Sequence, residues 1–170
     1  MSSVELSGCT IALPDTEFKQ DTTRKALFTN DNLVIAFFGA VDSKAFALLE
    51  RELNRSNVFD LVSSAYQTTV AGISQQPNMV ELRRYLVLVN FKARLAPVGS
   101  DHLWEVFDRR DFKGYVSGDL AKDGKVAVEI YIKEKDQFLS AIIKNKKQRG
   151  NMADAYHVLS ILSVRPNIGH

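Results

Sequence analysis

The most regular alternation of apolar and polar residues in the chain lies between residues 112 and 133. Branched apolar side chains occupy every even position from 126 to 132, after an Asp-Gly pair that is typical of a tight turn. Successive side chains of a strand point to opposite faces, so the segment predicts a β-hairpin with one apolar face. Only a three-residue loop over 122–124 places an apolar face opposite these positions, and we therefore predict that loop, with Gly124 at positive φ.

Four other segments have the composition of strands, namely 4–13, 33–38, 85–94 and 103–107. The second is a continuous apolar run, which is typical of a strand covered on both faces. The third is ambiguous, because Met79, Leu82, Leu86 and Val89 also fit one face of a helix. Its β-branched and aromatic content favours a strand.

Helical spacing of apolar residues and suitable capping residues occur in five places. Asp15, Asp42 or Ser43, Asn57, Asp136 and Asn151 are the candidate N-caps. The helices expected after them cover 15–28, 43–53, 58–73, 136–149 and 152–162.

These elements predict an α+β fold. We expect a mixed or antiparallel sheet, an N-terminal βαβ-like unit and two C-terminal helices packed on the sheet. The chain has 170 residues, of which 45% are hydrophobic, enough for one buried core. We therefore expect a single domain over 1–170, with a possible subdomain break near the polar segment 74–78.

Charge and cysteine content restrict the functional class only weakly. The net charge is +2, but residues 1–76 carry three excess negative charges and residues 77–170 five excess positive charges. Cys9 is the single cysteine, so the chain forms no internal disulfide, which favours a reducing compartment. The N-terminus lacks the features of a signal peptide, and no apolar run is long enough to span a membrane. We expect a soluble cytoplasmic protein.

The predicted hairpin register places aromatic and basic side chains together on its polar face. Tyr115 lies opposite Tyr131 and Lys113 opposite Lys133, and two arginines precede the hairpin. Exposed aromatics beside cations bind single-stranded nucleic acid by base stacking and phosphate contacts. The alternative is that this face of the hairpin is simply solvated, and that its lysines discourage another strand from pairing with the edge of the sheet. The candidate nucleic-acid-binding residues are Tyr115, Tyr131, Lys113, Lys133, Arg109 and Arg110.

Two other functions stay open beside RNA or single-stranded DNA binding. One is a protein-interaction or scaffolding module that forms a homodimer or larger homo-oligomer through apolar helices or a sheet edge. The other is a small metal-dependent nuclease using Asp119 and Glu129, although Tyr131 stands where such a site usually has a lysine. The scattered histidines, at 102, 157 and 170, form no recognisable catalytic or zinc motif. We assign no catalytic residue, metal ligand or cofactor, and favour a non-enzymatic binding or assembly protein.

The basic run from Lys144 to Arg149 is a further candidate for contact with phosphate or with an acidic partner. The expected helix over 136–149 gives it a second explanation, since cations stabilise a helix C-terminus. The sequence alone does not decide between these two explanations.

Overall fold

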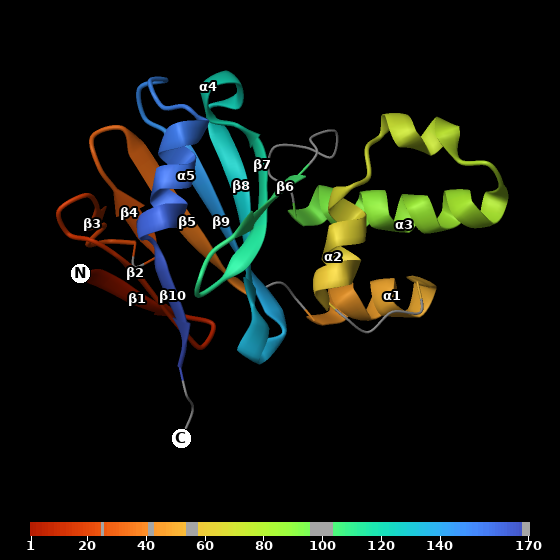
Figure 1. Ribbon diagram of the computed structural model, residues 1–170, viewed down its shortest axis with the longest axis horizontal. Coiled ribbons are helices and arrows are strands. Elements are labelled where there is room, and N and C mark those ends of the chain that lie inside the picture. Colours follow the sequence, from red (N-terminus) through yellow and green to blue (C-terminus); the bar gives the residue numbers. More distant parts are fainter. Residues whose placement is uncertain (25, 41–42, 54–57, 96–103, 168–170) are drawn as a thin grey trace.

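The protein is built from two antiparallel β-sheets and a set of helices, which confirms the α+β class (Figure 1). The computed structural model describes residues 1–24, 26–40, 43–53, 58–95 and 104–167. Three predicted features, the capping residues Asp42 and Asn57 and the start of the strand over 103–107, lie outside the described residues.

The smaller sheet joins the two ends of the described chain. β1 (Ser2–Leu6) and β2 (Cys9–Leu13) form a hairpin, and β10 (Ser163–Pro166) pairs with the other side of β2. Ile11, which is fully buried, lies opposite both Val4 and Val164. The predicted strand over 4–13 is therefore two strands with a turn between them.

The larger sheet has seven strands in the order β3-β4-β5-β9-β8-β7-β6. The strands are β3 (Lys19–Gln20), β4 (Leu27–Thr29), β5 (Leu33–Ala40), β6 (Trp104–Asp108), β7 (Lys113–Asp119), β8 (Lys125–Ile132) and β9 (Gln137–Asn145). β5 pairs with β4 on one side and β9 on the other, so the prediction of an interior strand is confirmed. Coverage of both faces was predicted wrongly, because Leu33, Ile35 and Phe37 are buried whereas Phe38, on the other face, is 49% exposed.

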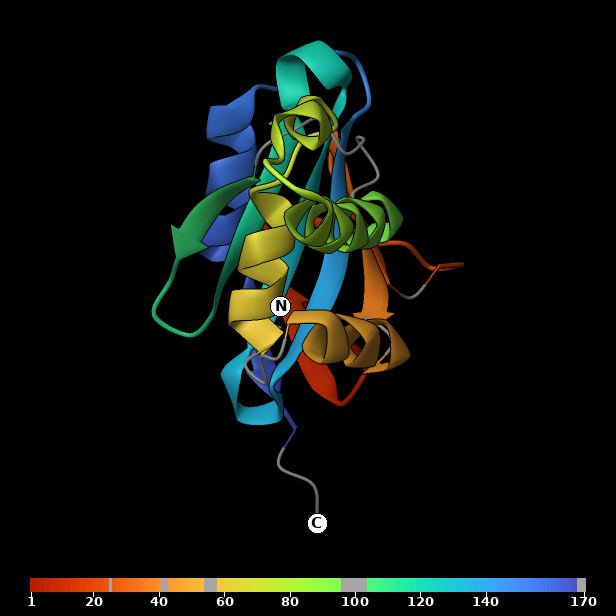
Figure 2. The ribbon, with the colours of Figure 1, turned by 90° about the vertical axis from the view of Figure 1, so that its right-hand side faces the viewer.

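One face of the larger sheet is covered along its length, and the opposite face is covered over β6, β7, β8 and β9. One face packs against the smaller sheet and α5 (Met152–Ile161), in a core that includes Ile11, Ile35, Val128 and Leu159. The opposite face packs against a helical layer formed by one continuous part of the chain (Figures 1 and 2). This layer consists of α1 (Ser43–Leu53), α2 (Val58–Tyr66), the 3-10 helix η1 (Ala71–Gln75) and α3 (Met79–Leu95).

The hairpin over 112–133 forms as predicted, but with a different loop and register. Gly124 has φ of +71°, which confirms its left-handed conformation. The loop is longer than expected because Leu120–Asp123 form a helical turn, α4, which Asp119 caps with its carboxylate. Val116 therefore pairs with Val128 instead of Ile130. The shift is by two residues, so each side chain keeps its predicted face.

Two predicted helices are wrong, and both segments are strands. In 15–28, Phe18 and Phe28 are buried but no helical stripe connects them, and the segment forms β3 and β4 instead. In 136–149, β9 lies between β5 and β8, where Phe138 contacts the helical layer and Leu139 the opposite core. The expected βαβ-like unit and the first of the two C-terminal helices are consequently absent from these described segments.

The third error is the strand predicted over 85–94, which is part of α3. Val89 and Phe91 of α3 are buried, whereas Met79 and Leu86 are exposed. The last helix was predicted correctly: Asn151 caps α5 in a reciprocal pair of hydrogen bonds with Asp154. Among the described residues, no helix is long and apolar enough to cross a membrane.

Candidate functional site

The two tyrosines of the predicted nucleic-acid surface are buried beneath the helical layer. Tyr115 is 0% exposed and Tyr131 9% exposed, and the ring of Phe59 from α2 lies 5.2 Å from each of them, centroid to centroid. Tyr66 of α2 packs edge-on against Tyr115. The prediction of an exposed stacking platform is wrong, because the polar-looking face of the hairpin is an internal packing face. Nucleic-acid binding elsewhere on the protein stays a prediction.

The four basic residues of that predicted surface are not brought together. Lys113 is opposite Tyr131, and its ammonium lies 4.1 Å from the centroid of the Phe59 ring. Lys133 is exposed in the 3-10 helix η2 (Lys133–Lys135), beyond the end of β8. The side chain of Arg109 donates to the backbone carbonyl of Leu159 on the other side of the sheet, and Arg110 is exposed in the β6–β7 turn.

The two carboxylates of the nuclease hypothesis are separated. Asp119 pairs with Lys125, and Glu129 pairs with Tyr115. Tyr115 is four residues from Asp119 along β7, so the two acids lie roughly 13 Å apart along the hairpin at about 3.3 Å per residue. Asp119 is used in capping α4 and Glu129 is enclosed. Nowhere in the described ranges do three His, Cys, Asp or Glu residues converge as metal ligands would. The predicted pairing of these acids around Mg²⁺ is therefore wrong.

Glu129 is the centre of a buried polar cluster between the sheet and α2. Its side chain is 1% exposed, and Ser140 donates a hydrogen bond of 2.6 Å to the carboxylate. Burial raises the pKa of Glu129 to about 8, more than the bond from Ser140 lowers it. Burial also raises the pKa of the neighbouring Tyr66, and the charge of Glu129 adds to that effect. The carboxyl group is thus held neutral at pH 7, in a place that substrate cannot reach.

Polar contacts anchor α3 to the rest of the helical layer, among them an ion pair of Arg83 with Glu52 of α1 at 3.4 Å. Lys92, which is fully buried, donates its ammonium to the carbonyl of Thr68 at 2.7 Å. Further along the helix, the hydroxyl of Tyr85 accepts from the backbone N–H of Thr69 at 2.9 Å. Figure 1 shows α3 running away from the sheets, with its N-terminal end farthest from them. One side of α3 is therefore fixed and the other faces solvent.

The solvent-facing side of α3 carries exposed apolar residues among charged and polar ones. Met79 is 77% exposed and Val80 62%, and Leu86 is also exposed. A shallow groove of about 550 Å³ runs along this side, and it is lined by residues of α3 between Met79 and Asn90. Contiguous exposed apolar surface of this kind is typical of a contact region, whereas single exposed apolar side chains are ordinary.

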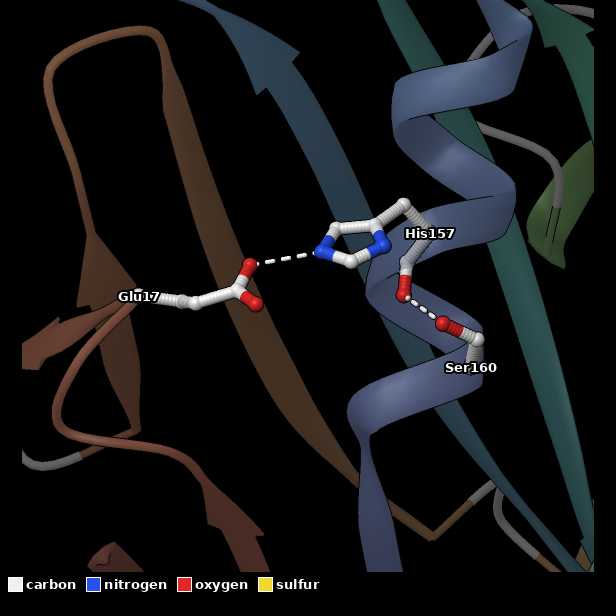
Figure 3. Close-up of polar contacts among 3 residues, drawn as sticks. All are labelled: Glu17, His157 and Ser160. Carbon is white, nitrogen blue, oxygen red and sulfur yellow. Dashed lines mark hydrogen bonds and ion pairs between the residues drawn. The ribbon is translucent and has the colours of Figure 1, made fainter.

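A polar cavity of about 320 Å³ lies on the opposite side of the larger sheet, beside α5. Figure 3 shows Glu17, from the segment before β3, and His157 of α5 pointing toward each other; the ring nitrogen and carboxylate oxygen are 2.6 Å apart. The hydroxyl of Ser160 donates to the backbone carbonyl of His157 and not to its ring. The three residues consequently do not form a nucleophilic triad.

Sequence reasoning missed both the exposed face of α3 and the polar cavity. The apolar spacing of Met79, Leu82 and Leu86 was visible, but nothing in it distinguishes a buried stripe from an exposed one. Glu17 and His157 are 140 residues apart in the chain, so no local motif connects them. Comparison with known proteins adds no assignment: no protein-family model, no curated protein and no solved structure matches this chain.

Proposed function

We propose that the protein is a non-enzymatic assembly protein that pairs with a second copy of itself through the outer face of α3. The single observation that carries this proposal is the apolar groove along α3, with its strongly exposed Met79, Val80 and Leu86. Burial of such side chains stabilises association by about 25 cal/mol for each Å² of apolar surface removed from water.

The spacing of the exposed residues supports a helix as the occupant of the groove. Met79, Leu82, Leu86 and Ala93 recur at intervals of three, four and seven, which is the pattern of a helix seam. Each is exposed or half-buried in the protein. A second α3 therefore offers a matching row of side chains at the same spacing.

Charge favours an antiparallel arrangement of the two helices. Arg83 forms an exposed ion pair with Glu52 of its own copy, at 3.4 Å. In a parallel pair it would also lie beside Arg83 of the second copy, and like charges repel. In an antiparallel pair centred on Leu86, Arg83 lies beside Asn90, whose amide oxygen can accept a hydrogen bond from the guanidinium. The same arrangement places Met79 against Ala93 and the two Leu86 side chains against each other. Such two-fold pairing is the commonest symmetry of protein homo-oligomers.

Substitution Leu86→Glu is expected to weaken the dimer by about 100-fold, because it removes a central apolar contact and brings two carboxylates together. Sedimentation velocity over a series of protein concentrations measures the dissociation constant. Val106→Glu is the matched control, since Val106 is an exposed apolar residue on the edge strand β6 and is 58% exposed. It is expected to leave the dissociation constant unchanged.

Cysteine cross-linking distinguishes the antiparallel arrangement from the parallel one. Leu86→Cys is expected to form an intermolecular disulfide readily, whereas Met79→Cys is not, because the two Met79 positions lie about 20 Å apart at about 1.5 Å per helical residue. Cys9 is buried and does not compete. A wild-type protein that is monomeric at every concentration, or a dimer broken by Val106→Glu but not by Leu86→Glu, would contradict the proposal.

A further inference from the structure

The polar cavity beside α5 is formed by four separate parts of the chain. They are the segment before β3, the β4–β5 turn, the β9–α5 loop and α5 itself. Its polar lining residues are Glu17, Asn30, Asn32, Arg149, Asp154 and His157. A second cavity of about 340 Å³ shares Glu17, Phe18 and Asn30 with it, and its further charged residues are Lys19, Lys146, Asp15 and Asp31. A volume near 300 Å³ lies at the lower end of small-molecule sites, so the space suits a small metabolite.

Three of the side-chain acceptors in the main cavity already have a partner within the protein. Glu17 contacts His157, and Asp154 accepts from the backbone N–H of Asn151 at 2.8 Å. The side-chain oxygen of Asn30 accepts two backbone N–H groups of the β4–β5 turn, at 2.9 and 2.8 Å. These three groups thus use part of their acceptor capacity within the protein, and the second oxygen of each carboxylate can still accept from a ligand.

The donors of the cavity are in the opposite situation. Because the oxygen of Asn30 is occupied, its NH₂ group is the part free to face a ligand. Arg149 is exposed at the cavity and forms no ion pair with an acidic residue in the described part of the chain. The cavity therefore presents donors from two directions, the β4–β5 turn and the β9–α5 loop.

The loop that carries Arg149 is held in place by its own hydrogen bonds. The side chain of Asn145 accepts from the N–H of Gly150 at 2.9 Å and donates to the carbonyls of Leu120 and Gly150. A side chain at position 150 would displace the side chain of Asn145 and with it these hydrogen bonds. This bracing holds the base of the Arg149 side chain in a fixed position before any ligand binds, which reduces the entropic cost of binding.

From these observations we infer that the cavity binds the phosphate group of a small phosphorylated metabolite, with Arg149 and Asn30 as donors. A phosphate accepts hydrogen bonds on several oxygens at once, and a guanidinium binds it with two parallel bonds. The remaining volume accommodates a small organic group attached to the phosphate. The basic run noted in the sequence thus contributes Arg149 directly, and Lys146 contributes to the neighbouring cavity.

Titration of ¹⁵N-labelled protein with glycerol 3-phosphate, followed by NMR, tests this inference. Saturable shifts are expected for the amides of residues 149–158, with inorganic phosphate binding about 10-fold more weakly and acetate more weakly still. Absence of saturable shifts in this segment, or acetate binding as tightly as glycerol 3-phosphate, would overturn it.

Three substitutions sharpen the test. Arg149→Ala is expected to weaken binding at least 10-fold, whereas Lys147→Ala, which removes the same charge from an exposed neighbour outside the cavity lining, changes it less than 2-fold. Glu17→Gln removes a negative charge from the cavity and is expected to strengthen binding several-fold. Equal losses for Arg149→Ala and Lys147→Ala would indicate diffuse attraction by the basic loop and would overturn the assignment of the cavity.

Discussion

Glu129→Gln is expected to remove most of the loss of stability that the wild-type protein suffers between pH 4.5 and pH 8. The pKa of Glu129 is raised from 4.5 to about 8 because its carboxyl group is buried between β8 and α2. In this range the folded protein keeps the proton and the unfolded chain releases it. The contribution of Glu129 to stability is therefore fully present below pH 4.5, falls as the pH rises toward 8, and changes no further above that.

The size of the effect follows from the shift in pKa. A change of one unit corresponds to about 1.4 kcal/mol, so the shift of Glu129 predicts a loss of about 5 kcal/mol in the free energy of unfolding. Glutamine cannot ionise, and its amide oxygen can still accept the hydrogen bond from Ser140. Above pH 8 the variant is expected to be more stable than the wild type.

Urea unfolding at several pH values from 4 to 9 measures this difference. Glu134→Gln is the control, because it makes the same chemical change at an exposed position in η2. Its stability should follow that of the wild type across the range. If Glu129→Gln also followed the wild type, the carboxyl group would be ionised in the folded protein and the buried cluster would be incorrectly described.

Gly114→Ala is expected to destabilise the protein by about 3 kcal/mol or more. A Cβ atom at this position in β7 would overlap the backbone carbonyl of Glu129 in β8 and would lie 2.9 Å from the ring of Phe107. The backbone of a central strand cannot move away without disturbing its own hydrogen bonds, so overpacking here is costly. The midpoint of urea unfolding is expected to fall sharply.

Gly124→Ala gives the matched comparison for Gly114→Ala. No atom lies within 4 Å of the position that its Cβ would take, so its cost comes from the positive φ of +71° alone. That conformation costs an alanine about 1 to 2 kcal/mol. If Gly114→Ala lowered the free energy of unfolding no more than Gly124→Ala does, the close approach of β7 and β8 would not be the reason for glycine at position 114.

The features predicted correctly from the sequence depend on local chemistry. Gly124 bends the chain because it alone tolerates that conformation cheaply, and Asn151 begins α5 because its side chain satisfies a free backbone N–H. The assignment of side chains to the two faces of the hairpin is also confirmed, because successive side chains of any strand point to opposite faces. These predictions required no knowledge of distant parts of the chain.

The features predicted wrongly depend on what covers each segment. β9 is buried on both faces, so Phe138, Leu139, Ile142 and Ile143 form a nearly continuous apolar run in which helix and strand cannot be distinguished. The alternation in the hairpin correctly placed Tyr115 and Tyr131 on the second face, but only the position of α2 decides that this face is dry. The candidate surface failed for that reason.

The pairing of Ile11 with Val164 has a consequence for how the protein is made. These residues are more than 150 positions apart, so closing the smaller sheet requires a large loss of chain entropy and waits until almost the whole described chain has left the ribosome. Until then, β2 has one unpaired edge and an uncovered apolar side. Newly synthesised chains are therefore expected to depend on chaperones, and truncation before Ser163 should yield aggregation-prone material rather than a smaller stable protein.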